Sequence, residues 1–202
     1  LAGTAFLRET SQVGHLIMGI VDFYYKNNST DKNIWVSTYI YSQAEYLREG
    51  SYYGMTVGEY GDVTERQGNS IGDHWVGTGS TVHGCPPSAT RHAGDLGNFI
   101  CTNTGLISDT RELNMLGFFK DDARGSIIGR AVALHGTEDQ CEGSYIGPYI
   151  AIGTIGIAYK ASSNIGLDFE PNLLVARITG TIYCFVCQGT AWIWKDTEAN
   201  VI

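Results

Sequence analysis

The stretch His74–Asn98 constrains the fold more than any other part of the chain. Glycine and proline interrupt it throughout, so we expect neither a helix nor a long strand there. A loop of this length inside a compact domain needs a reason to be ordered, and a bound metal ion is one such reason. Three of the chain's five histidines and one aspartate lie within the stretch: His74, His83, His92 and Asp95.

These four side chains form a set that suits a tetrahedral zinc ion. Three imidazoles and one carboxylate fill all four positions around the ion, which is the pattern of a structural zinc site. The free energy of metal binding then offsets the entropy that the loop loses when it becomes ordered. Histidines also collect in polar loops without binding metal, but a cluster of three with an aspartate favours the metal site.

The composition predicts an all-β protein. The chain has 202 residues, enough for one large domain with an adequate core. Its 26 glycines, four prolines and many tyrosines and β-branched runs are typical of strands joined by tight turns. The net charge of -8 argues against nucleic-acid binding, because no basic stripe exists to neutralise phosphates. No apolar run approaches the roughly 18 residues that a membrane-spanning helix needs.

Several features together favour a secreted protein. Two overlapping glycosylation sequons start at Asn27 and Asn28, within a polar stretch that is typical of a hairpin loop. The chain contains five cysteines, and it starts at Leu1 rather than at methionine, which indicates processing or a chosen boundary. Disulfides persist in the oxidising conditions outside the cell, so we expect the protein to be extracellular.

Alternation and turn signals predict a series of strands. The run IWVSTYIY at 34–41 alternates with period two, as a half-buried strand should. The connection 43–51 is expected to hold at most a turn of helix. Strands are expected at or within residues 4–8, 16–25, 34–41, 52–60, 96–101, 106–119, 126–135 and 149–158. Without a convincing amphipathic helix, this pattern predicts a Greek-key sandwich or barrel over residues 1–158.

Residues 159–202 are expected to form a C-terminal extension. Two further strands are predicted at 173–187 and 191–194, joined by 188–190 and packed on the first domain or at a subunit interface. Cys184 and Cys187 have zinc-finger-like spacing, but they lie in one apolar strand without a second pair, so metal binding is not expected there. They face opposite sides of a strand, and one of them could pair instead with Cys101 or with another chain.

Four motifs resemble those of the Cu/Zn superoxide dismutase family: GMTVGEYGD, HGCPPSATRHAGDLGN, SIIGRAVALH and IGTIGIA. The resemblance covers roughly residues 4–158 and is most specific over 83–98. It implies the Greek-key β-barrel of that family. His74 matches the family's histidine that bridges zinc and copper, and the remaining zinc ligands are matched by His83, His92 and Asp95.

The resemblance also places two residues beside the zinc set. His135 matches the family's last copper ligand. Asp139 matches an aspartate that hydrogen-bonds ligand histidines, which implies that it fixes the tautomer and orientation of His83.

The chain departs from the family at the copper site. Two copper histidines are replaced by Thr56 and Gly58, and His74 and His135 alone are too few to hold a redox copper ion selectively. Tyr149 stands where the family has a catalytic arginine. The loop that steers superoxide is shortened to 136–148 and is acidic, so it repels an anion. These departures imply that dismutase activity is lost.

The expected disulfide differs from the family's as well. The family's own disulfide positions fall near Gly68 and at Ile152. Cys85 lies in the zinc loop, and Cys141 lies two residues after Asp139. If Asp139 contacts His83, the two cysteines are neighbours, so a Cys85–Cys141 bridge is our hypothesis, with two small buried thiols as the alternative.

The pattern of lost ligands resembles that of secreted, non-catalytic members of the family in molluscan body fluids, the pernin and cavortin type. We therefore expect a zinc-binding haemolymph protein that binds or stores divalent metal ions, self-assembles into a homo-oligomer and is not an enzyme. One alternative is a residual copper/zinc dismutase that holds copper with His74, His135 and a further ligand. Another is a structural or host-defence protein in which zinc only orders the loop.

Overall fold

The computed structural model divides the chain into two compact units, Leu1–Ile157 and Ala158–Ile202. The structure describes residues 2–25, 33–43, 46–103, 105–118, 123–143, 147–158, 175–178 and 189–192. In the second unit the described residues form strand β10 (Val175–Ile178), which pairs antiparallel with β11 (Gly189–Trp192). How this extension packs stays a prediction.

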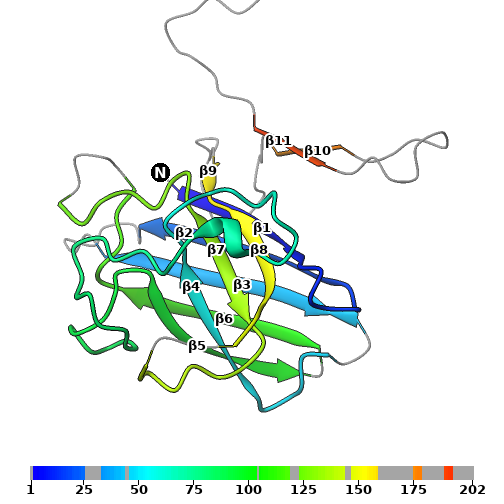
Figure 1. Cartoon of the computed structure of the whole chain (residues 1–202), viewed down its shortest axis with the longest axis horizontal. Coiled ribbons are helices and arrows are strands. Elements are labelled where there is room, and N and C mark those ends of the chain that lie inside the picture. Colours follow the sequence, from blue (N-terminus) through cyan, green and yellow to red (C-terminus); the bar gives the residue numbers. More distant parts are fainter. Residues whose placement is uncertain are drawn as a thin grey trace, which may run out of the picture. The chain divides into compact units, whose positions relative to one another are not determined.

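The first unit is a closed antiparallel barrel (Figure 1). Its eight strands are β1 (Ala2–Glu9), β2 (Ile17–Tyr25), β3 (Ile34–Ser42), β4 (Tyr52–Val57), β5 (Asp95–Asn103), β6 (Leu106–Leu113), β7 (Ala131–His135) and β8 (Tyr149–Thr154). They follow the order β1-β2-β3-β6-β5-β4-β7-β8, and β8 returns to β1. A short strand, β9 (Gly156–Ala158), pairs with β1 outside this ring. The predicted all-β Greek-key barrel is therefore confirmed.

Alternating side chains fill the barrel interior. Along β2 and β3, buried residues alternate with partly or fully exposed ones, as the period of two predicts. Ile17, Val21 and Phe23 point inward from β2 and are fully buried. Gly19 lies between them because the backbones approach closely there: a Cβ atom at Gly19 would lie 2.6 Å from the Cα atom of Ile40.

Several strand boundaries differ from the predictions; for example, the strand predicted at 149–158 is divided into β8 and β9. The strand predicted at 52–60 ends at Val57, because Gly58 leaves the ladder and pairs with His74 in an isolated bridge. The strand predicted at 126–135 begins only at Ala131, since Ser126 forms an isolated bridge with Gly117 and a turn follows at residues 128–129. In the extension, Gly189 and Thr190 belong to β11 rather than to the predicted linker.

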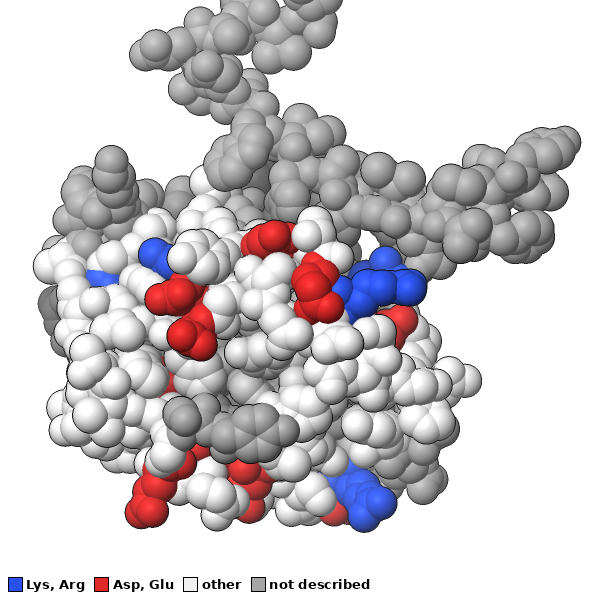
Figure 2. Space-filling model, viewed as in Figure 1, with Lys and Arg blue, Asp and Glu red and all other residues white. Residues whose placement is uncertain are grey.

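Charged side chains are scattered over the barrel surface. On the face shown in Figure 2, acidic and basic groups lie singly or in small clusters, and the described arginines form no continuous stripe. Within the described part of the chain, no helix is both long enough and apolar enough to cross a membrane.

Candidate metal centre

Both ends of the long loop are fastened to strand β4. The N–H of Trp75 donates to the carbonyl of Val57, the N–H of Val57 donates to Gly94, and the N–H of Gly94 donates back to Trp75, each at 2.8 Å. A Cβ atom at Gly94 would lie 2.4 Å from the Val57 carbonyl oxygen, so only glycine fits this approach. These bonds bring His74, at the start of the loop, beside Asp95, the first residue of β5.

A buried arginine holds the middle of the loop, and the sequence analysis missed it. The Arg91 side chain is almost fully buried and donates to the carbonyls of Ser88 and Asp95 and to Asn114 Oδ1. Burial lowers the pKa of this guanidinium, although the Asp95 carboxylate opposes the shift. The sequence gives only a weak signal for this burial: Arg91 stands next to His92 in a loop that has few apolar residues.

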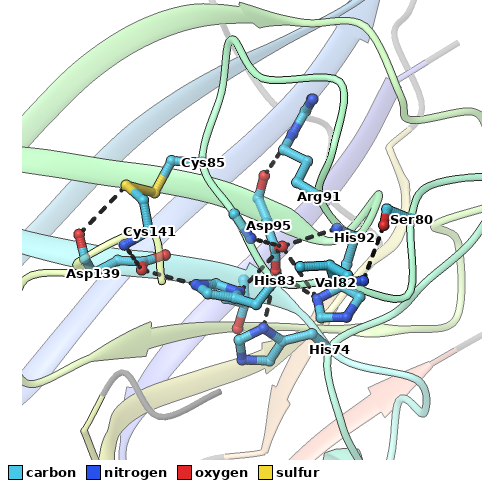
Figure 3. Close-up of polar contacts among 12 residues, drawn as sticks. His74, Ser80, Val82, His83, Cys85, Arg91, His92, Asp95, Asp139 and Cys141 are labelled. Carbon is cyan, nitrogen blue, oxygen red and sulfur yellow. Dashed lines mark hydrogen bonds and ion pairs between the residues drawn. A yellow bond between two sulfur atoms is a disulfide. The ribbon is translucent and has the colours of Figure 1, made fainter. Parts of the chain in front are cut away.

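The four predicted ligands converge on one point (Figure 3). Asp95 is fully buried at the centre, with its Oδ1 atom 2.9 Å from Nδ1 of His74. Its Oδ2 atom lies 3.1 Å from Nδ1 of His83 and 3.1 Å from Nδ1 of His92. One ligand atom from each of these residues lies within 4.8 Å of the others, so a single metal ion could contact all four.

The outer hydrogen bonds set the imidazole tautomers so that lone pairs face the carboxylate. His83 Nε2 lies 2.9 Å from Asp139 Oδ1, and His92 Nε2 lies 3.3 Å from the Thr81 carbonyl; both partners only accept, so both Nε2 atoms donate. In neutral imidazoles the Nδ1 atoms of His83 and His92 are then acceptors that face Asp95, another acceptor. Nδ1 of His83 is buried without a hydrogen-bond donor in the described structure. A cation between these acceptors removes the conflict, so the donor set fits a metal ion.

The charge state of Asp95 also fits a ligand. Burial raises the pKa of its carboxyl, but hydrogen bonds from His74 and Gly84 and the charges of His83 and His74 together lower it below its ordinary value. Two backbone N–H groups, those of Gly84 and His92, donate to Oδ2 at 3.1 and 2.9 Å. The anionic form is therefore present at neutral pH, as a carboxylate ligand requires.

The hypothesised disulfide is present. Cys85 and Cys141 are bonded, with their Cα atoms 5.0 Å apart. Asp139, two residues before Cys141, contacts His83 as the resemblance implied. Cys101 is a buried free thiol among the described residues. The open question of a pairing with Cys184 or Cys187 falls on residues outside the described part of the chain.

His135, the residue predicted at the copper site, forms hydrogen bonds through both of its ring nitrogens. Its Nδ1 atom donates to the carbonyl of Gly147 at 3.2 Å. Its Nε2 atom therefore accepts, and the Thr56 hydroxyl lies 2.9 Å from it. Both side chains are almost fully buried. The hydroxyl at position 56 thus occupies the lone pair with which His135 would bind a metal.

Position 58 has no room for a side chain. A Cβ atom at Gly58 would lie 2.7 Å from the carbonyl oxygen of Ile71 and 3.0 Å from Cγ1 of the same residue. Ile71 ends the 3-10 turn Asn69–Ile71 and is fully buried. It belongs to a small apolar cluster of residues that includes Ala131, Ala133 and Ile152, with Tyr149 packed against it. Apolar packing therefore fills this side of the barrel.

Three further positions complete this region. The Tyr149 ring lies 4.8 Å from the His135 ring, and burial, with a smaller effect of Asp73, raises the pKa of its phenol, so it stays neutral. Gly68 and Ile152, the positions of the family's disulfide, are neighbours: a Cβ atom at Gly68 would lie 3.4 Å from Ile152 Cγ2.

Acid is expected to destabilise the fold through His135. Burial, followed by the charges of nearby histidines, lowers its pKa from 6.5 to about 4, whereas the unfolded chain has the ordinary value. Between these values the unfolded state binds more protons, so stability falls as the pH drops from about 6.5 to about 4, by at most about 3 kcal/mol from this group. An NMR titration should show the His135 ring still neutral at pH 5.5. A ring that protonates near its ordinary pKa contradicts this.

The remaining predicted residues lie outside the described part of the chain. These are the sequons at Asn27 and Asn28, and the cysteines Cys184 and Cys187. Their roles stay predictions.

Comparison with known proteins agrees with this architecture. The family model of copper/zinc superoxide dismutase matches residues 17–155. The chain is 33% identical over 129 residues to extracellular superoxide dismutase [Cu-Zn] 3 of Dictyostelium discoideum, covering 62% of this chain and 30% of that protein. It is 32% identical over 142 residues to extracellular superoxide dismutase [Cu-Zn] of Drosophila melanogaster, covering 66% and 73%. The chain thus spans less than a third of the Dictyostelium protein's length.

A solved structure is similar as well. The crystal structure of the clock protein EA4 has a TM-score of 0.60 and 27% sequence identity to this chain, and the match covers 77% of this chain and 94% of that one. The fold and the convergent histidine and aspartate cluster define a β-barrel protein with a site that could hold a metal ion. The chain belongs to the Cu/Zn superoxide dismutase family.

Proposed function

We propose that this protein is a secreted, non-catalytic member of the dismutase family that binds one zinc or similar divalent ion and has no competent copper site. The observation that carries the proposal is the Thr56–His135 hydrogen bond, since it occupies the metal-binding nitrogen of a copper position with a hydroxyl. The close packing of Ile71 on Gly58 supports it, because a second copper histidine does not fit there.

Zinc suits the remaining site better than a redox metal. Three imidazoles and one carboxylate complete a tetrahedron without an open position. Bound zinc would supply charge that neutralises Asp95 and accepts the lone pairs of His83 and His92. The protein's own residues orient these ligands: Asp139 and the Thr81 carbonyl fix two rings, and backbone N–H groups fix the carboxylate.

The surroundings of the former copper position also disfavour superoxide chemistry. Tyr149 is neutral where the family's arginine carries a positive charge. Glu138 and Glu142, which lie close in sequence to the buried Asp139, are exposed to solvent. Their negative charges repel an incoming anion. Substrate attraction and copper binding are therefore both weakened.

Secretion is supported by several independent features. The similar Dictyostelium and Drosophila proteins are extracellular enzymes. The Cys85–Cys141 disulfide and the two sequons suit the same environment. We infer a body-fluid protein of the pernin and cavortin type, a homo-oligomer that binds or stores divalent metal.

Metal content per chain tests this function. The protein is purified without chelator and analysed by elemental mass spectrometry, and superoxide consumption is measured on the same sample. About one zinc with negligible copper and no activity supports the proposal. Stoichiometric copper with activity instead supports the residual dismutase, in which His74 and His135 recruit another ligand.

Metal exchange separates storage from a purely structural or host-defence role. A storage site should exchange isotopically labelled zinc while the protein stays folded. A structural site should release zinc only on unfolding.

A further inference from the structure

A short strap, Asp139–Cys141, joins the metal centre to the barrel wall. Asn98 on β5 holds it with two reciprocal hydrogen bonds: its Nδ2 donates to the Asp139 carbonyl at 2.8 Å, and its Oδ1 accepts the Asp139 N–H at 2.7 Å. The barrel therefore fixes the backbone of Asp139 independently of any metal.

One oxygen atom of this strap, Asp139 Oδ1, orients the His83 ring. Asp139 Oδ1 accepts from His83 Nε2 at 2.9 Å and from the backbone N–H of Cys141 at 2.7 Å. Asp139 and His83 are both buried, so water competes little with these bonds. The orientation of His83 toward the metal position thus depends on where the strap lies.

The disulfide closes the strap onto the loop (Figure 3). Cys85 lies two residues after His83, and Cys141 lies two residues after Asp139, so the covalent chain and the His83–Asp139 hydrogen bond form one ring. Cys141 has a φ of 63°, a left-handed conformation that a non-glycine residue keeps only where its surroundings hold it. Cys141 is exposed, so a reductant can reach the bond.

We propose that the Cys85–Cys141 disulfide makes metal binding redox-dependent: the centre holds its metal tightly when the bond is formed and loosens when a thiol or phosphine reductant opens it. Asn98 is a second, redox-independent positioning residue. The inference rests on the proposed metal-binding function. Loss of the bond frees Cys141 to relax, which weakens the donor to Asp139 and with it the hold on His83.

The electron balance is complete for either reductant. A dithiol supplies two electrons and two protons, becomes a cyclic disulfide and leaves Cys85 and Cys141 as thiols. With a phosphine, the electron pair of phosphorus breaks the S–S bond. Water then gives its oxygen to the phosphine oxide and its two protons to the thiols.

The test compares zinc affinity by competition with a chromophoric chelator in the full chain. The variants are C85S/C141S and Asn98→Ala, and wild type is measured with and without a phosphine, which competes for zinc less than a dithiol does. We expect zinc affinity 10- to 100-fold weaker in the reduced wild type and in both variants, as for other residues that orient ligands. The phosphine should not weaken C85S/C141S further.

Two readouts separate positioning from general unfolding. The cobalt-substituted protein reports ligand geometry in its visible spectrum, and the His83 Nε2 proton reports the Asp139 bond by NMR; both should change while circular dichroism shows a folded barrel. Asn98→Asp keeps the acceptor for the Asp139 N–H and should recover part of the affinity. Asn33→Ala is the matched control, because that amide bonds to Glu112 on β6.

The outcomes are distinguishable. If oxidised wild type binds no zinc, the proposed function fails and the inference fails with it. If it binds one zinc and C85S/C141S binds it equally well, the redox dependence is refuted while the metal site stands. Equal binding by Asn98→Ala refutes its positioning role alone.

Discussion

Replacing Asp95 with asparagine is expected to weaken zinc binding at least about 100-fold while the metal-free barrel stays folded. The carboxylate supplies the negative charge among three neutral imidazoles, and a direct ligand should cost at least as much as the residues that orient it. An asparagine oxygen at the Oδ2 position can still accept from the N–H groups of Gly84 and His92. Its amide nitrogen, at the Oδ1 position, can donate to an imidazole lone pair.

Chelator competition and urea unfolding measure the two effects separately. At 1,000-fold excess of zinc over the wild-type dissociation constant, wild type should gain about 4 kcal/mol of stability, whereas Asp95→Asn, with affinity weaker by at least about 100-fold, should gain about 1.4 kcal/mol or less. Asp95→Ala should lose about 3 kcal/mol more even without metal, because buried N–H groups lose their acceptor. Asp109→Asn, which disturbs the Arg111 ion pair on β6, is the control. Undiminished zinc binding by Asp95→Asn means that Asp95 is not a ligand.

The two histidine substitutions that complete the copper set are not expected to restore a stable copper site by themselves. Gly58→His alone should cost about 3 kcal/mol, since its Cβ atom meets the Ile71 backbone and side chain. Thr56→His replaces the hydroxyl that occupies His135. The triple variant T56H/G58H/I71A removes the Cγ1 contact but leaves the Ile71 carbonyl oxygen 2.7 Å from the Cβ position. It should therefore bind more copper than T56H/G58H, which should be unstable and poor in copper, and yet stay less stable than wild type.

Elemental analysis and the electron paramagnetic resonance spectrum of Cu²⁺ measure this result. A comparison of Gly58→Ala with Gly14→Ala isolates the steric cost of a Cβ atom at position 58, because a Cβ atom at Gly14 meets nothing within 4 Å. The first should lower the free energy of unfolding by about 1–3 kcal/mol and the second by less than about 0.5 kcal/mol. Equal stability of the two variants contradicts the steric account.

The four residues of the candidate metal centre could be predicted from sequence because their types and glycine-rich setting carry the signal. His74, His83, His92 and Asp95 lie within 22 residues of each other in the chain, and the structure brings them together. The disulfide followed from one implied contact, Asp139 on His83. The barrel followed from period-two alternation, although the boundaries shifted where backbone groups found partners in loops.

Other features depend on distant neighbours and leave little trace in the sequence. An arginine is usually exposed, so the burial of Arg91 is visible only once the loop is folded around it. The bond between Thr56 and His135 joins residues 79 apart in the chain. Ile71 reads as an ordinary apolar residue until its contact with Gly58 is known.

The contact between Ile71 and Gly58 gives this barrel a direction in evolution. A histidine at position 58 collides with the present Ile71, while shrinking Ile71 first leaves a cavity that costs about 2–5 kcal/mol. Each single step is therefore selected against, and the two together relieve only the side-chain part of the collision, because the carbonyl oxygen of residue 71 stays 2.7 Å from the Cβ position. A lineage that acquires this packing therefore cannot regain a histidine at position 58 by one neutral substitution.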